Sequence, residues 1–230
     1  IELNDSQLIA FLGNEVVQLD TAGGATTLDT LVGSGRLPLA RNRKLTPQIA
    51  IITSAGQYYV LESGVMTLVA DPDLPAPNFV TYVKGFFVFS IADGRIFASD
   101  LDEGTAINAA SFDTANSNSD GNVAVFEHAG FLYVFGRKST EIWQADPALA
   151  ASPFIFSPVQ QNIALGCSAP HSIAQVGLGL MWVDNDGIVR YGRDGGAIRI
   201  STHTVERAIE DLTIVEREAI GGRQWFFQGH

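Results

Sequence analysis

The chain has 230 residues, of which 46% are hydrophobic and 17% charged. This balance is that of a globular protein with one or at most two domains, and it excludes a disordered chain. The 25 acidic and 14 basic residues give a net charge of −11, which argues against direct wrapping of nucleic acid because most of the surface would repel it.

The first predicted feature along the chain is a repeat. Six segments share an apolar run, a tight turn that contains glycine, a second apolar run, another turn and a third strand. They begin at Gln7, Gln48, Asn78, Asn122, His171 and Glu216. Their first turns fall at Gly13-Asn14, Ala55-Gly56, Lys84-Gly85, Ala129-Gly130, residues 177–179 and Gly221-Gly222. The starts are roughly 30 to 50 residues apart, a spacing typical of propeller blades.

The strands of the fourth repeat indicate how these sheets pack. Residues 123–126 and 131–135 are apolar at nearly every position, whereas an antiparallel sheet with one wet face should alternate. A propeller blade packs on two neighbours and buries both faces. A β-sandwich is the main alternative, but its strands should alternate more cleanly. We therefore predict an all-β, β-propeller-like array of antiparallel three- to four-stranded blades, which need not be complete, with Phe135 and Trp143 buried between blades.

One short helix is expected over residues 205–212, where Val205, Ile209 and Leu212 share a face and Ser201 and Thr202 are N-cap candidates. Two proline-rich stretches, residues 71–78 and 146–153, are expected to connect blades. The chain starts without a methionine and stops within a strand-like pattern, so residues 1–230 are expected to be a single propeller-like domain cut from a longer protein.

A local basic cluster interrupts the acidic sequence. Arg36, Arg41, Arg43 and Lys44 place four basic residues within nine positions. A solvated loop is the simpler interpretation. The alternative is a docking patch for an acidic partner, and these four residues are the candidate partner-docking site.

The sharpest local motif is a calcium look-alike. Asn116, Asn118, Asp120, Gly121 and Glu127 follow the spacing of a calcium loop, with Asn in place of the first Asp. An EF-hand needs flanking helices, and a strand is expected to follow here. We therefore expect a polar loop that binds no calcium, and no other metal or cofactor. Residues 184–187, "DNDG", are expected to form a hairpin turn.

Catalytic arrangements are not recognisable. The only cysteine, Cys167, is expected to be structural and buried, despite His171 four residues later, and a single cysteine fits a reducing compartment. Ser34 lacks the frame of a nucleophile elbow. Three acidic residues near a turn could resemble the pair of catalytic carboxyl groups in a glycosidase, but neighbouring acidic residues in a turn are more often exposed to solvent. These acids are Asp100, Asp102 and Glu103. The chain is therefore predicted not to be an enzyme, and no secretory signal or membrane-spanning segment is expected.

Several segments, in the same order along the chain, resemble the packaged-DNA stabilisation proteins of short-tailed phages. These proteins form the hub, or nozzle, of the phage tail. The segments are "VGSGRLPLARNR" (32–43), "FFVFSIADGRIFASDLDE" (86–103), "FDTANSNSDGNVAVFEHAGFLYVFGRKSTEIW" (112–143), "IALGCSAPHSIA" (163–174) and "RISTHTVERAI" (199–209). The resemblance covers nearly the whole chain, although family members extend further at both ends.

The resemblance implies a structural virion protein of the tail, assembled in the bacterial host cytoplasm. Several copies, six by analogy, would form a ring below the portal and its adaptor, continue the DNA channel and stabilise the packaged genome. The partners it implies are the portal adaptor, the tail needle and the tailspike or fibre. An acidic channel wall would let the duplex slide without binding it.

Two other classes of function stay open at the level of sequence. A carbohydrate-binding or glycan-cleaving propeller could stack sugars on exposed aromatic residues, although most of these lie in strand patterns typical of a core. The aromatic residues concerned are Tyr58, Tyr59, Trp143 and Trp182. A calcium-dependent adhesion module would depend on the loop at Asn116. Aromatic and carboxylate side chains that converge at the propeller axis would favour the glycan site.

Overall fold

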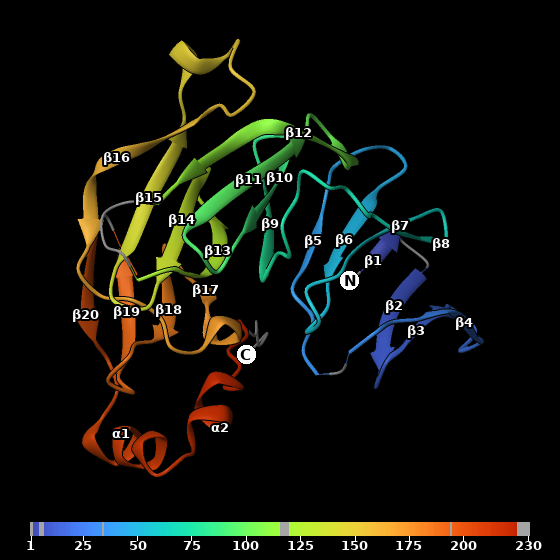
Figure 1. The fold of residues 1–230 in the computed structure, drawn as a ribbon. Helices are drawn as coiled ribbons and strands as arrows, with labels where there is room; N and C mark the ends of the chain where they lie inside the picture. The colour runs from blue at the N-terminus through green and yellow to red at the C-terminus, as the bar shows by residue number, and fades with distance from the viewer. Residues whose placement is uncertain (1, 5–6, 34, 116–119, 194, 225–230) are drawn as a thin grey trace.

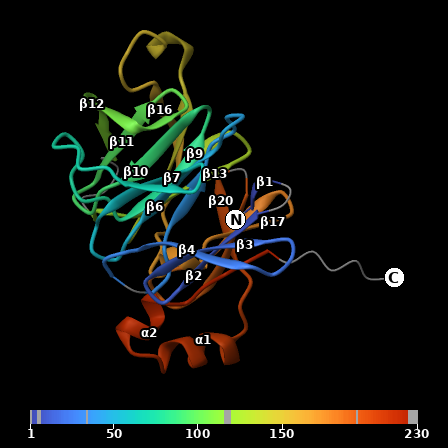
Figure 2. The same cartoon turned by 90° about the vertical axis from the view of Figure 1, so that its right-hand side faces the viewer.

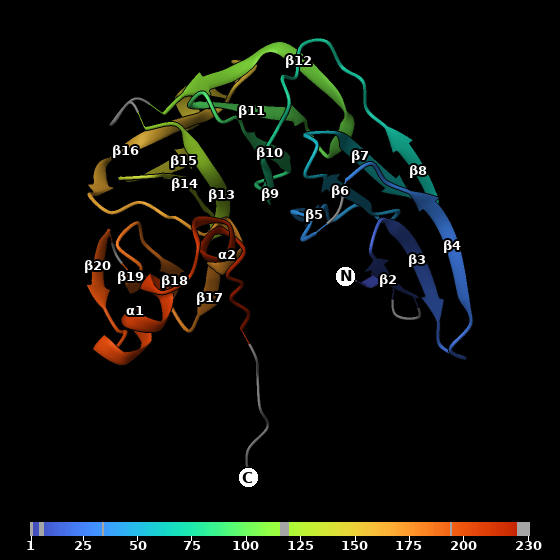
Figure 3. The ribbon, with the colours of Figure 1, turned by 60° about the horizontal axis from the view of Figure 1, so that its bottom comes forward.

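The structure is a computed structural model that describes residues 2–4, 7–33, 35–115, 120–193 and 195–224. These residues form five four-stranded antiparallel sheets, followed by two short α-helices. The strands of each sheet are hydrogen-bonded in chain order, so each sheet is a meander of hairpins. The sheets stand side by side around an arc (Figures 1 and 3), which confirms the predicted propeller-like array of blades.

The first three blades use the N-terminal half of the chain. Blade 1 contains β1 (Glu2–Asn4), β2 (Gln7–Leu12), β3 (Glu15–Asp20) and β4 (Ala25–Thr30). Blade 2 contains β5 (Leu39–Arg41), β6 (Gln48–Ile52), β7 (Tyr58–Glu62) and β8 (Val65–Leu68). Blade 3 contains β9 (Phe79–Val83), β10 (Phe86–Ser90), β11 (Arg95–Asp100) and β12 (Glu103–Thr114).

The last two blades and the helices complete the described chain. Blade 4 contains β13 (Asn122–His128), β14 (Phe131–Gly136), β15 (Thr140–Ala145) and β16 (Phe156–Ile163). Blade 5 contains β17 (Ala174–Val176), β18 (Gly179–Val183), β19 (Val189–Arg193) and β20 (Gly196–Arg199). The helices are α1 (His203–Glu210) and α2 (Ile214–Glu218), with short 3₁₀ turns η1 (Pro147–Leu149) and η2 (Pro170–Ser172).

Neighbouring residues of one strand belong to different cores, which explains the lost alternation. On β14, Val134 packs into the core between blades 3 and 4, while Phe135 packs into the core between blades 4 and 5. On β13, Val125 and Ala124 divide in the same way. Both faces of blade 4 are therefore dry, and apolar residues are favoured at consecutive positions.

A separate hydrophobic core fills each junction between blades. The core of blades 2 and 3 is rich in aromatic residues and contains Tyr58, Phe87, Phe89 and Phe97. Trp143 is 1% exposed in the core between blades 3 and 4, and Phe135 is 0% exposed. Both side chains were predicted to be buried between blades, and this prediction is confirmed.

The predicted hairpin turns use residues with positive φ. At Lys84-Gly85 the φ angles are 53° and 97°, and at Ala129-Gly130 they are 54° and 82°. Two successive positive φ values are the signature of the tight turn whose twist matches the flanking strands. The "DNDG" turn between β18 and β19 is also confirmed, with Gly187 at φ 75°.

Three predicted boundaries are wrong. Residues 146–153 do not connect blades: they lie between β15 and β16, within blade 4, and carry η1. The proline-rich stretch 71–78, by contrast, connects blades 2 and 3 as expected. Blades 1 and 2 begin one strand before the predicted starts at Gln7 and Gln48, because β1 and β5 have only three residues each and give no periodic signal.

The predicted sixth repeat, which was to begin at Glu216, is helical at its start. Glu216 lies within α2, and a reciprocal pair of hydrogen bonds fixes the start of that helix. The Glu216 amide donates to Thr213 Oγ1 at 3.3 Å, and the Thr213 amide donates to the Glu216 carboxylate at 2.9 Å. This Thr-x-x-Glu capping box is a signal that favours helix over strand. Gly221-Gly222 follows α2 and forms no hairpin in the described chain, and residues 225–230 lie outside it.

The predicted helix is present as α1, two residues earlier than expected, and it packs on the last blade. Ile209 packs on Val183 and Ala169, together with Ile220 from the chain after α2. Glu206 accepts hydrogen bonds from Arg199 of β20 and from Ser201, and so joins α1 to blade 5. The helices thus pack on the end of blade 5 at the turn between β18 and β19, whereas Ile198 of β20, on the face without a neighbouring blade, is 63% exposed. Figure 2 shows them at one end of the molecule, with the 146–155 loop at the opposite end.

Candidate functional site at the propeller axis

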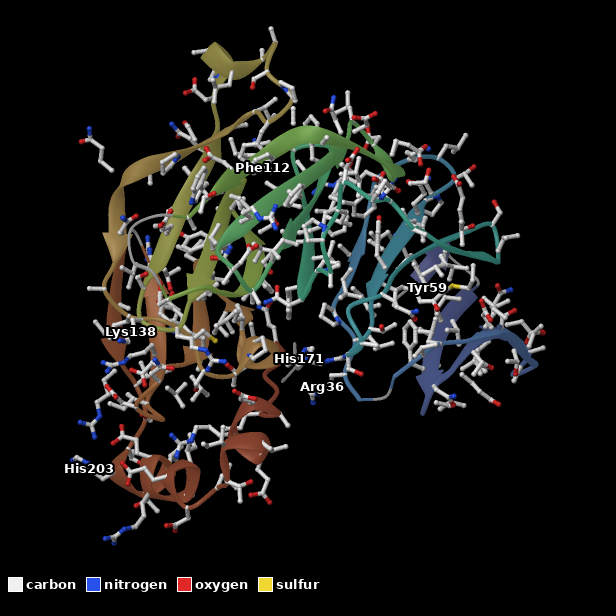
Figure 4. The ribbon with its side chains drawn as sticks, viewed as in Figure 1. Arg36, Tyr59, Phe112, Lys138, His171 and His203 are labelled. Atoms are coloured by element: carbon white, nitrogen blue, oxygen red, sulfur yellow. The ribbon has the colours of Figure 1, made fainter. Side chains whose placement is uncertain are left out.

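The structure distributes the four residues of the predicted docking patch over different surroundings. Arg41 ends β5, Arg43 lies in the following loop, and both are exposed. Arg36 lies in the connection between blades 1 and 2, away from that loop (Figure 4). Lys44 is half-buried and pairs with Glu103 at 3.3 Å. The charge of Lys44 is thus already paired within the chain.

A polar network surrounds Lys44 and joins blades 2 and 3. At its centre is Gln48, which is 1% exposed. Gln48 Oε1 accepts from the Gly104 amide at 2.8 Å, and Nε2 donates to the Glu103 carboxylate at 2.7 Å. The backbone amide of Gln48 donates to Asn42 Oδ1 at 2.7 Å. This hydrogen bond joins the two ends of the loop that carries Arg43 and Lys44. The loop that carries Arg43 is therefore anchored by buried hydrogen bonds rather than by its charges.

Glu103 is the ionised member of this network. Partial burial by itself raises the pKa of Glu103, but hydrogen bonds from Gln48, Thr105 and Lys44 outweigh burial and lower it to about 2. Its neighbour Asp102 accepts a hydrogen bond from the Tyr82 hydroxyl. Two of the three acids considered as an imitation of a glycosidase pair are therefore bound to protein groups, and Asp100 is exposed.

A hollow of about 720 Å³ lies at the inner ends of the blades, and we call it the axial hollow. Its walls come from β2, the connection before β5, the inner strands of blades 3 and 4, and the chain on either side of blade 5. The lining residues are 8–11, 35–39, Phe79, Phe126, Pro170, His171, Ile173, Gly222 and Arg223. Figure 3 shows β2 and the chain after α2 on opposite sides of the centre of the arc.

One side of the axial hollow is cationic. Arg36 and Arg223 are its charged side chains, and no acidic residue lines it within the described chain. A Cβ atom on Gly221 would lie 1.4 Å from Arg36 Nη1, so the guanidinium lies directly against the Gly221 backbone. The Gly222 amide donates to the His171 carbonyl at 2.9 Å. Figure 4 shows Arg36 and His171 close together at the centre of the molecule.

His171 lies on this cationic side and contacts the apolar lining. Its ring lies 5.7 Å from the ring of Phe79, measured between centroids. Partial burial and the charge of Arg36 lower the pKa of His171 below its ordinary value, so the imidazole is neutral at neutral pH. Sequence reasoning paired His171 with Cys167 and missed its proximity to Arg36, because 135 positions of chain separate the two residues and only the closing of the blades brings them together.

The calcium look-alike loop is only partly described, because Asn116 and Asn118 lie outside the described residues. Asp120 accepts hydrogen bonds from the backbone amides of Lys138 and Ser139, in the turn between β14 and β15. Glu127 accepts from the Gly130 amide at 2.8 Å. Both carboxylates therefore stabilise hairpin turns of blade 4 by accepting hydrogen bonds from backbone amides. In the described part of the chain, no three His, Cys, Asp or Glu side chains converge to hold a metal ion.

Cys167 is buried, as predicted, and its thiol donates to the Ala169 carbonyl at 3.2 Å. Burial raises the pKa of Cys167 to about 12, which keeps the sulfur protonated and unreactive at neutral pH. Ser34, the other nucleophile considered from the sequence, lies outside the described residues.

The aromatic residues of the glycan hypothesis belong to the cores. Trp143 and Trp182 are each 1% exposed, and Tyr58 and Tyr59 are also buried. The phenylalanine rings that line the axial hollow are Phe11, Phe79 and Phe126, and the charged side chains of the described lining are arginines rather than carboxylates. The convergence of aromatic and acidic side chains that a glycan-cleaving site requires is therefore not found in the described lining. Among the described helices, none is long and apolar enough to cross a membrane.

The chain is a β-propeller-type protein, because its four-stranded blades pack face to face through dry junctions. Residues 3–226 match the family described as "Bacteriophage P22 Gp10, beta-propeller". The chain therefore belongs to this family of phage packaged-DNA stabilisation proteins. Membership assigns it to the structural proteins of a phage, which indicates a place in the virion. No curated protein matches the chain significantly.

Solved structures show the same fold at low sequence identity. One is PorZ, described as a bacterial surface component of the type-IX secretion system of Porphyromonas gingivalis, with a TM-score of 0.56 and 15% identity over 85% of this chain. Another is BamB from Moraxella catarrhalis, with a TM-score of 0.55 and 14% identity over 88%. A third is BBS1N in complex with ARL6DN, with a TM-score of 0.57 and 12% identity over 86%.

The alignments span 27%, 60% and 65% of those three chains, respectively. At such identities the likeness concerns the fold alone, because one fold carries many functions.

Proposed function

We propose that this chain is a non-enzymatic component of the tail hub, or nozzle, of a short-tailed phage, where it continues the DNA channel below the portal and keeps the packaged genome inside. The observation that carries the proposal is the family match over residues 3–226. Several copies, six by analogy, would form the ring, next to the portal adaptor, the tail needle and the tailspike or fibre.

Two physical properties of the chain support a passive channel. The net charge of −11 disfavours tight binding of duplex DNA, so that a wall of this protein lets DNA move. The dry core at each blade junction gives a stiff unit, because close-packed interiors resist deformation. A channel that holds DNA under pressure needs stiffness and weak adhesion together.

The test is to assemble particles without the protein, add it back, and measure the DNA that stays protected from nuclease. The proposal expects particles that lack the protein to lose their DNA and particles that regain it to retain DNA. Equal retention with and without the protein would contradict the role. Tight duplex binding by the purified protein at physiological salt would contradict the passive channel.

The exposed Arg41 and Arg43 are the candidates for docking to an acidic neighbour in the tail. Charge pairs at the edge of an interface steer association and set orientation. Reversal of both charges, Arg41→Glu with Arg43→Glu, should leave the fold intact, because the loop is anchored through Asn42 and Gln48. Joining to neighbouring tail proteins should weaken, and the effect of the reversal should shrink at high salt, which screens both the lost attraction and the new repulsion.

The matched control reverses two exposed charges elsewhere, Lys138→Glu with Arg207→Glu. Assembly is measured by the fraction of particles that retain DNA. Normal retention with the Arg41 and Arg43 double variant would remove the docking role from this loop while leaving the proposed hub function intact.

A further inference from the structure

The axial hollow has a charge opposite to that of the molecule around it. The chain carries 25 acidic and 14 basic residues, yet the charged side chains of the described lining are Arg36 and Arg223. No hydrogen bond or ion pair joins either guanidinium to another side chain in the part of the chain that the structure describes. Two cations that line the same hollow repel each other, and an anion bound in the hollow would relieve that repulsion.

The lining also contains apolar side chains. Leu8 and Phe11 of β2 are among the lining residues, and Leu8 is 45% exposed. Phe79 and Phe126 add two aromatic rings from the inner strands of blades 3 and 4. A volume of about 720 Å³ lies in the range of sites that enclose a drug-sized ligand. A ligand that uses the whole hollow therefore needs both an anionic and an apolar part.

An extended peptide meets this requirement when its side chains alternate. Successive side chains of a strand point to opposite sides, so carboxylates on one side can reach Arg36 and Arg223 while apolar side chains on the other contact β2. A phosphate group uses only the cationic side. Duplex DNA is disfavoured by the acidic surface around the opening.

We propose that the axial hollow binds an extended segment of a partner protein in which acidic and apolar residues alternate, with Arg36 as the main carboxylate-binding residue. The choice of a polypeptide over a small metabolite rests on the proposed structural role in the virion. Arg36 is well suited because its planar guanidinium forms paired hydrogen bonds with a carboxylate, and its contact with Gly221 holds it at the hollow.

The test is a binding measurement on the purified protein by fluorescence anisotropy. The probes are labelled, acetylated hexapeptides of alternating Glu and Leu, alternating Gln and Leu, and alternating Lys and Leu, with inorganic phosphate as competitor. The Glu-Leu peptide should bind about tenfold more tightly than the Gln-Leu peptide, and the Lys-Leu peptide should not bind. Binding of the Glu-Leu peptide should weaken as salt is raised.

Variants locate the site. Arg36→Gln should weaken Glu-Leu binding by about tenfold, and Arg36→Lys by less, because lysine keeps the charge but not the planar fork. Arg207→Gln, which removes an exposed arginine on α1, should have no effect. Because Arg36 packs on Gly221, its variants are first compared with the parent in thermal unfolding, and Arg223→Gln provides a second test of the same hollow.

Three results would overturn the proposal: equal binding of the Glu-Leu and Gln-Leu peptides, displacement of the peptide by phosphate at equal concentration, or unchanged binding in both arginine variants. None of these results bears on DNA retention. Conversely, loss of the DNA-retention role would leave a positive peptide result standing, so the two proposals fail separately.

Discussion

Gln48 shows how a single polar side chain can connect two blades. Its amide bonds both to the backbone of Gly104 and to the carboxylate of Glu103, across the junction of blades 2 and 3. Buried polar groups must be hydrogen-bonded, and a network that crosses a junction fixes the position of one blade relative to the next. Lys44, a member of the basic cluster, contributes to this junction.

The low pKa of Glu103 makes a prediction about acid stability. The pKa of Glu103 is about 2 in the folded state, below its ordinary value of 4.5. Between pH 2 and pH 4.5 the unfolded state therefore binds more protons than the folded state. Stability from Glu103 is therefore complete above about pH 4.5 and is lost as the pH falls towards 2. Since Glu103 is 37% exposed, we expect a contribution of only about 1 kcal/mol.

The measurement is urea unfolding of the parent and of Glu103→Gln at several pH values from 6 to 3. The variant should be less stable at pH 6, and the difference should shrink as the pH falls. A difference that stays constant with pH would show that the charge of Glu103 does not stabilise the junction. Glu15→Gln, an exposed carboxyl on β3, serves as the control.

At the scale of the element, β14 combines a fully buried and a partly exposed phenylalanine. Phe135 is 0% exposed and packs edge-on against Trp182 at 5.4 Å between ring centroids, whereas Phe131 on the same strand is 38% exposed. Phe135→Ala should lower the free energy of unfolding by about 3–5 kcal/mol. Phe131→Ala should cost much less. Equal losses, measured by chemical denaturation, would mean that blade 5 does not pack on blade 4.

Helix α1 packs on the end of blade 5 at the turn between β18 and β19. Ile209 is 8% exposed and packs on Val183, while Val205 on the same helix is 45% exposed. Ile209→Ala should cost about 2 kcal/mol, and Val205→Ala about 0.5 kcal/mol or less. The two variants are compared by thermal unfolding. Similar behaviour of both would contradict the packing of α1 on blade 5.

The sequence predicts most of the blades because their signals are local. Paired turn residues such as Ala129-Gly130 and the two-faced apolar run of β14 each specify a blade within about 15 residues. The start of blade 1 could not be predicted, because β1 has three residues and owes its pairing to β2. Helix α2 was missed although its capping box at Thr213 was readable. The axial hollow could not be foreseen, since Arg36, His171 and Arg223 meet only after five blades have been placed.

At the scale of the whole molecule, five blades form an open arc whose two ends differ. Helix α1 packs on one end of blade 5, whereas blade 1 leaves Leu8 and Leu12 of β2 exposed, at 45% and 63%. The axial hollow lies between these ends. The architecture therefore combines stiff blade junctions with an open apolar and cationic surface, a combination suited to a subunit that must join others.

The central claim is that this propeller is a structural subunit of a phage tail, and the most direct test is a density map of the virion that contains it. The account predicts several copies of the five-blade arc, six by analogy, in a ring directly below the portal, with acidic surface towards the DNA. A map in which the protein is absent from the tail, or lies as separate copies away from the DNA path, would contradict the account.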